Sequence, residues 1–147
     1  MRKGQISIDF LFAITLISIT LLNMVYIANM QQSHAETFDV TTRLKVFAVG
    51  IRDSVAKVYA VGNGFAIKKD SPFNLKGGDN ITIQLVSGDN KIVITGNING
   101  KKYVTVQRSP VPIYQNQSIT MTPDKSEIWI KAQDKGGKTY VELSYSP

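Results

Sequence analysis

Residues 1–35 read MRKGQISIDFLFAITLISITLLNMVYIANMQQSHA. Two basic residues, Arg2 and Lys3, stand before Gly4, and no Asp, Glu, Lys or Arg occurs between Phe10 and Ala35. Because a helix that crosses a bilayer needs roughly 20 consecutive apolar residues, this stretch is long enough to span one. The basic leader in front of it favours a cytoplasmic N-terminus, with the remainder of the chain outside.

A single carboxylate, Asp9, stands at the entrance to the apolar stretch. An ordinary secretory signal places its small-residue cleavage site after the apolar region. Here the small residue Gly4 comes before the apolar region, so a cut behind it would leave the helix in the mature protein. On physical grounds alone, Asp9 has a second interpretation as an interfacial residue that caps the first turn, where the helix dipole favours an anion.

The stretch Lys3-Gly4-Gln5-Ile6-Ser7-Ile8-Asp9-Phe10 resembles the class III signal peptide of archaeal type IV pilins, in which a Gly is followed by Gln-x-Ser-x-Glu-Phe. The resemblance implies that a prepilin peptidase cuts between Gly4 and Gln5. Asp9 stands where the family usually has Glu, so this chain departs by one methylene and keeps the charge. The remainder of the chain carries no signature of this family.

The resemblance also implies how the subunits assemble, through Gln5, Asp9 and Phe10. In the family, the acid is thought to meet the free amine that cleavage creates, on its own or on a neighbouring subunit. Each charge is costly alone in an apolar core and tolerable as a hydrogen-bonded pair. Cyclisation of Gln5 to pyroglutamate would remove the amine and with it this pairing.

The partners that the resemblance implies are further copies of the chain in a helical filament, a prepilin peptidase, a cytoplasmic assembly ATPase and a membrane platform protein. The precursor would lie in the cytoplasmic membrane, and the product would be an extracellular filament on the cell surface that serves adhesion or surface attachment, with DNA handling as a further role. Two alternatives stay open: a filament or accessory subunit of an archaellum, and a single-pass membrane-anchored protein that binds an extracellular ligand.

The helix is expected to continue beyond the apolar stretch, because Gly50 is the only glycine and no proline occurs between Met30 and Gly62. Apolar residues recur with steps of three and four, which predicts one buried stripe of an amphipathic helix. Gly62 can end the helix in a left-handed conformation. The stripe consists of Val40, Leu44, Phe47, Ile51, Val55 and Val58.

After Gly64 the pattern changes to short alternating segments, which predicts antiparallel strands. Asn99-Gly100 predicts a tight hairpin, and the stretch Ser109-Pro-Val-Pro-Ile113 predicts a connection, because proline lacks the ladder donor. In the last segment, Val141, Leu143 and Tyr145 are expected on one face. Breaker-bounded segments lie at 64–69 and 72–76, and strands are expected at 80–86, 91–95, 103–108, 118–122, 127–133 and 138–144, with a turn at 134–137.

The predicted fold class is therefore α+β, with a long N-terminal helix followed by a small antiparallel sheet or sandwich. Four regions follow from this interpretation. They are a cleaved leader at 1–4, a membrane or filament-core helix at 5–30, an amphipathic continuation at 31–62 and a β head at 63–147.

The composition argues against an enzyme. The 147 residues include no Cys and one His, so thiolate chemistry and the usual metal sites are excluded, and no catalytic residue, metal site or cofactor is expected. The lone His34 is interpreted as a solvated helix residue. The formal net charge of +6 falls to +4 without Arg2 and Lys3, an excess for which solvated lysines are a sufficient explanation.

Two further kinds of site are candidates on the head. Asn80 and Asn116 each begin an Asn-x-Ser/Thr acceptor sequence for N-glycosylation, and Asn116, beside the proline-rich connection, is expected to be the more exposed. Lys101, Lys102 and Arg108 are candidate nucleic-acid contacts.

Overall fold

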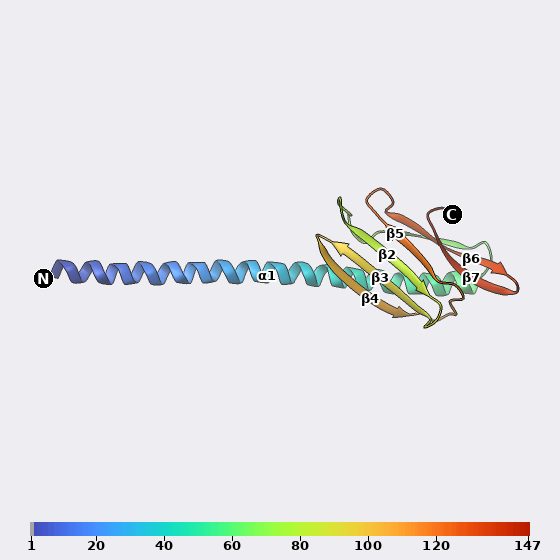
Figure 1. Cartoon of the computed structure of the whole chain (residues 1–147), viewed down its shortest axis with the longest axis horizontal. Coiled ribbons are helices and arrows are strands. Elements are labelled where there is room, and N and C mark those ends of the chain that lie inside the picture. Colours follow the sequence, from blue (N-terminus) through green and yellow to red (C-terminus); the bar gives the residue numbers. More distant parts are fainter. Residues whose placement is uncertain (1) are drawn as a thin grey trace. The chain divides into compact units, whose positions relative to one another are not determined.

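The computed structural model describes the backbone of residues 2–147 and the side chains of residues 7–147. It confirms the α+β arrangement, because one long helix is followed by two small antiparallel sheets (Figure 1). The chain divides into two compact units, Met1–Asp39 and Val40–Pro147. The elements are α1 (Arg2–Val61), β1 (Ala66–Asp70), β2 (Asn80–Val86), β3 (Lys91–Ile98), β4 (Lys101–Arg108), β5 (Gln117–Met121), β6 (Glu127–Lys135) and β7 (Lys138–Ser144).

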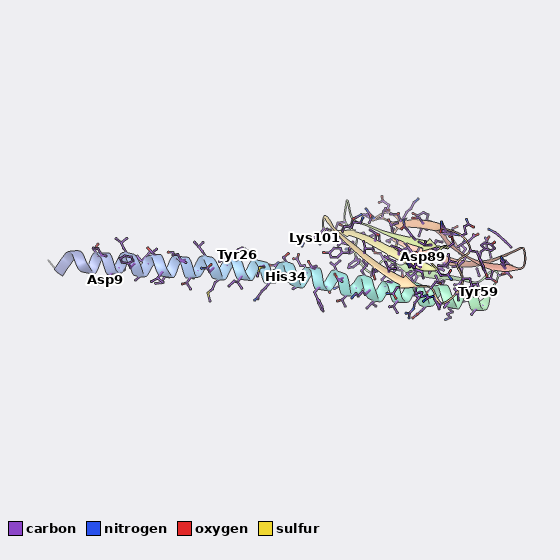
Figure 2. All side chains as sticks on the ribbon, turned by 60° about the horizontal axis from the view of Figure 1, so that its bottom comes forward. Asp9, Tyr26, His34, Tyr59, Asp89 and Lys101 are labelled. Carbon is purple, nitrogen blue, oxygen red and sulfur yellow. The ribbon has the colours of Figure 1, made fainter. Side chains whose placement is uncertain are left out.

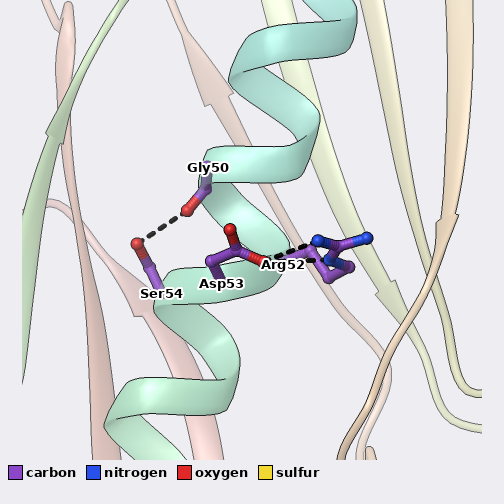
Figure 3. Close-up of polar contacts among 4 residues, drawn as sticks. All are labelled: Gly50, Arg52, Asp53 and Ser54. Carbon is purple, nitrogen blue, oxygen red and sulfur yellow. Dashed lines mark hydrogen bonds and ion pairs between the residues drawn. The ribbon is translucent and has the colours of Figure 1, made fainter.

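In the second unit, the predicted stripe of α1 forms the centre of the core. Val40, Leu44, Phe47, Ile51, Val55 and Val58 are all buried. Ala48 and Ser54, which the stripe did not include, are buried as well. The buried hydroxyl of Ser54 is satisfied because it donates to the carbonyl of Gly50 at 2.7 Å, one turn earlier (Figure 3).

The helix ends as the sequence predicts. Gly62 has a φ of 90°, and its N–H donates to the carbonyl of Val58 at 3.0 Å. Only glycine adopts this left-handed conformation without steric cost, so the chain turns here into β1.

The strands form two antiparallel sheets, with the orders β1-β6-β7 and β4-β3-β2-β5. Each sheet buries one apolar face, as the alternation shows in β2 and β3 of one sheet and in β6 of the other. Figure 1 shows both sheets beside the C-terminal part of α1. Gly96 in β3 lies under Leu44, because a Cβ built at Gly96 would stand 3.5 Å from Leu44 Cδ1. The buried strand residues are Ile81, Ile83, Leu85, Ile92, Ile94, Ile98, Ile119, Met121, Ile128, Ile130, Ala132 and Val141.

The two sheets meet at a seam between β5 and β7. The N–H of Leu143 donates to Gln117 Oε1 at 2.7 Å. The hydroxyl of Tyr145 donates to the carbonyl of Thr120 at 2.7 Å and accepts from the N–H of Thr120 at 3.3 Å. Side chains thus satisfy backbone groups at the edges of both strands, and β1 and β4 remain as the outer strands.

Several sequence predictions were inaccurate in detail. β3 continues past Thr95 to Ile98, because Gly96 pairs with Ile81 of β2 and Tyr103 of β4 and does not end the strand. The last hairpin turns at Gly136-Gly137, both with positive φ. Tyr145, expected on one face with Val141 and Leu143, is exposed at the seam, whereas Val141 is buried.

Asp79 organises the end of the β3–β4 hairpin. The predicted turn is present, with φ values of 51° at Asn99 and 73° at Gly100. The carboxylate of Asp79, 9% exposed, accepts from the N–H of Asn99 at 2.9 Å and from the N–H of Lys76 at 3.0 Å. Both backbone donors would otherwise lack a partner in a partly buried position.

The packing of α1 against the sheets yields a test with two matched valines. Replacing the buried Val55 with Ala should lower the free energy of unfolding of the full chain by about 2 kcal/mol, since the helix cannot close the resulting space. Replacing Val46, 67% exposed on the same helix, should change it by less than about 0.5 kcal/mol. Thermal or denaturant unfolding in detergent measures both, and equal effects would contradict the assigned core.

Candidate functional site

The N-terminal unit presents an apolar helix with no partner inside its own fold. Every side chain from Ser7 to Glu36 is exposed. This helix is long and apolar enough to cross a membrane, and none of its most apolar window is buried. The large apolar side chains exposed up to Met30 are Ile8, Phe10, Leu11, Phe12, Ile14, Leu16, Ile17, Ile19, Leu21, Leu22, Met24, Val25, Tyr26, Ile27 and Met30.

The polar groups on this apolar surface are satisfied locally. The hydroxyls of Thr15, Ser18 and Thr20 each donate to the carbonyl four residues earlier at 2.8 Å. The amide of Asn23 donates to the carbonyl of Ile19 at 3.0 Å. These groups therefore offer few unsatisfied donors to lipid or to a neighbouring helix.

Asp9 is exposed on α1, on the same helix as Tyr26 and the exposed His34 (Figure 2). No Lys or Arg occurs between Lys3 and Arg43. The carboxylate thus has no ion-pair partner among the residues whose side chains are described. The predicted cleavage site, Gly4 and Gln5, lies in α1, and the side chain of Gln5 is outside the described part.

Charge is divided unevenly along the chain. From Gln5 to Asp39 the charged residues are three acids, Asp9, Glu36 and Asp39. The unit Val40–Pro147 holds 15 Lys and Arg and 8 Asp and Glu, a net charge of +7. Residues 1–39 hold two basic and three acidic residues, so the two units carry opposite formal charge.

Ion pairs occupy part of the basic surface of the second unit. A hydrogen bond from Lys91 at 2.8 Å lowers the pKa of Asp89 in the β2–β3 turn (Figure 2). Arg52 donates to Asp53 at 2.8 Å (Figure 3), and Lys135 lies 2.6 Å from Glu142. These pairs are exposed, so they contribute little to stability and mainly set where charge remains unpaired.

Two further ion pairs involve Lys68 on β1. Its ammonium lies 2.6 Å from Glu127 and 3.5 Å from Asp70. The hydrogen bond to Glu127 is the largest cause of the raised pKa of Lys68. The small stabilisation from this pair is fully present below the ordinary pKa of lysine and would be lost as the pH rises through the raised value.

The candidate nucleic-acid contacts all lie on β4, an outer strand of the four-stranded sheet. Lys101, Lys102 and Arg108 are exposed there. Val104 and Val106, 57% and 51% exposed, separate Lys102 from Arg108 on the outer face. Charged side chains, lysine above all, commonly protect outer strands from pairing with another chain, and this accounts for the cluster without a nucleic acid.

The structure distinguishes the two glycosylation candidates. Asn80 lies within β2, half-buried, and its Oδ1 accepts from Asn97 at 2.9 Å. Asn116 is exposed, and its Oδ1 accepts from the N–H and the hydroxyl of Ser87 at 2.8 and 2.9 Å. N-linked attachment leaves the amide oxygen in place, so a glycan on Asn116 is compatible with both bonds.

Two features of the second unit were missed from the sequence. One is a tyrosine cluster, in which the rings of Tyr114 and Tyr140 lie 5.4 Å apart and Lys138 Nζ lies 5.1 Å from the Tyr114 ring. Hydrogen bonding with Tyr114 raises the pKa of Tyr59 in the last turn of α1. The cluster joins residues far apart in sequence, so no local pattern could have indicated it.

The other missed feature is a groove of about 600 Å³ between α1 and β1. Val46, an exposed apolar residue outside the predicted stripe, was its only signal in the sequence. Among the described residues, no group of three or more His, Asp or Glu could hold a metal ion.

Neither a family model, nor a curated protein, nor a solved structure matches the chain. Its functional interpretation therefore depends on the residues and their geometry.

The different positions of the two acceptor asparagines predict different occupancy. If the head is exported into a compartment with N-glycosylation, Asn116→Gln should remove the glycan mass, because this asparagine is exposed and Asn80 lies within a sheet. Asn80→Gln is the matched control and should leave the mass unchanged. Intact-protein mass spectrometry measures both, and a glycan lost only in Asn80→Gln would contradict the assignment.

Proposed function

We propose that the chain is a type IV pilin-like structural subunit, made as a membrane-anchored precursor and polymerised through its N-terminal helix. The leader would be cut after Gly4, the apolar helices would leave the lipid to form a filament core, and the β heads would form the outer surface. The filament would serve adhesion or surface attachment. Prepilin peptidase, assembly ATPase and platform protein are the partners of this proposal.

The observation that carries the proposal is the apolar surface of α1. Fifteen large apolar side chains between Ile8 and Met30 are exposed. Burying each one contributes about 1.5–3 kcal/mol, so roughly 20–45 kcal/mol of hydrophobic free energy depends on the surroundings of this helix. A typical domain is stable by only about 5–15 kcal/mol, so the helix requires lipid or other helices around it.

The position of Asp9 favours a polymer over a permanent single-pass anchor. A carboxylate at the centre of a membrane helix costs about 2.5–3.5 kcal/mol, and less near its end. Cleavage behind Gly4 would create an amine four residues before Asp9. In a bundle of apolar helices, this amine and the carboxylate would neutralise each other, whereas an uncut chain would have no such amine.

Both alternatives have the same N-terminal membrane helix followed by a β head. Each predicts a different measurable property. An archaellum subunit would be needed for swimming, and the pilin-like subunit for attachment. A monomeric ligand-binding protein would keep Met1 and remain a monomer in detergent.

Processing gives the most direct test of the proposal. N-terminal sequencing of the chain from sheared surface filaments should begin at Gln5, or be blocked by pyroglutamate with a mass that matches cleavage there. A Gly4 variant with a bulky residue should accumulate in the membrane as the uncut precursor. Filaments built from chains with an intact Met1 would contradict the proposal.

Substitutions of Asp9 test whether its negative charge is needed for filament assembly. Asp9→Ala should reduce filament yield more than tenfold with normal processing at Gly4, because an unpaired charge in an apolar core costs about 3–5 kcal/mol. Asp9→Glu is the matched control, since it keeps the carboxylate, and it should retain filaments. Electron microscopy of the surface fraction measures both variants. Normal filaments from Asp9→Ala would exclude the pairing.

A further inference from the structure

The groove between α1 and β1 has an apolar floor. It measures about 600 Å³, within the size range of sites that bind ligand-sized groups. Val46 on one wall is 67% exposed, although Phe47 beside it is buried in the core. The groove is lined by Thr42, Arg43, Val46, Phe47, Gly50, Lys68, Lys69, Asp70 and Pro72.

The groove also holds a cation that is not used within the described part of the chain. Lys68 is paired with Glu127 and Asp70. Lys69 is in no ion pair with any described residue, and its Nζ lies 3.8 Å from the position of a Cβ at Gly50. The ammonium of Lys69 therefore lies over the backbone of Gly50, on the wall of the groove. A matching ligand therefore combines an apolar group with an anion.

One segment of the chain has this combination, and its apolar member, Phe38, lacks an explanation in the fold. Phe38 is 75% exposed, more than any other large apolar side chain described. It lies beyond the charge-free stretch, among polar residues, so neither lipid nor the head core accounts for it. Asp39 follows it, about 100° around the helix, so both side chains can face one groove.

We propose that the groove of one copy receives Phe38 of a second copy, and that Asp39 of that second copy pairs with Lys69. The occupant is another copy because the groove is basic, whereas the only charged residues from Gln5 to Asp39 are acids. Residue 38 and the groove are different surfaces, so the contact is heterologous and can propagate along a filament. This inference rests on the proposed function, in which neighbouring molecules are copies of the same chain.

Disulfide trapping in the full chain tests the contact. The chain has no Cys, so any disulfide formed must join introduced residues. Differently tagged Phe38→Cys and Val46→Cys chains are co-expressed, and membranes and sheared filaments are oxidised. The mixed disulfide should exceed that of a Phe38→Cys and Val61→Cys pair about tenfold, because a disulfide requires Cα atoms within about 7 Å. Val61 is a matched control, since it is 59% exposed on the same helix outside the groove.

Charge reversal tests the polar half of the contact. Lys69→Asp should reduce the mixed disulfide about tenfold, and Asp39→Lys in the chain with Phe38→Cys should restore it, because opposite charges then face each other again. Glu36→Lys is the control, as Glu36 lies roughly 160° around the helix from Phe38, and it should have no effect.

The outcomes distinguish failure of the proposed contact from failure of the proposed function. Normal filaments without the mixed disulfide would overturn the contact and leave the proposed function standing. A mixed disulfide in a chain that forms only small oligomers would support the contact and contradict the proposed filament. If Val46→Cys instead links to Phe12→Cys, the groove receives the apolar stretch and the contact with Phe38 is wrong.

Discussion

The contact between one stripe of α1 and the inner faces of both sheets is the interaction on which the second unit depends. Sheets of three and four strands are small, and each has a single apolar face to bury. The stripe from Val40 to Val58 covers both. Leu44 of the stripe packs directly over Gly96 in β3. The helix that completes the core of the second unit is therefore also the helix that carries the apolar stretch.

The parts of the fold that follow from local patterns were predictable. Helix periodicity identified the stripe, glycine identified the end of α1, and Asn99-Gly100 identified a hairpin, because each depends on a few neighbouring residues. The sheet order and the seam were not predictable. Tyr145 reaches Thr120 through a contact 25 residues away in sequence, and nothing in its neighbourhood indicates this partner.

The candidate sites likewise divide into those that the sequence indicates and those that only the structure reveals. Asp9 and Gly4 stand out because a lone acid or a small residue beside an apolar stretch is visible in one dimension. The groove is not, since it combines residues of α1 with residues of β1 that are far apart in the sequence. Phe38 was not singled out from the sequence either, because only the structure shows that its side chain is exposed.

The seam between β5 and β7 has a consequence for molecules held at very high density. Two separate sheets have four edge strands, and an unprotected edge strand readily pairs with an edge strand of an adjacent molecule. Here the side chains of Gln117 and Tyr145 bond to the backbone of the edge strands β7 and β5. The remaining two, β1 and β4, carry Lys68, Lys69, Lys101 and Lys102, which repel a like-charged strand. Identical heads can thus be crowded together without merging into amyloid-like aggregates.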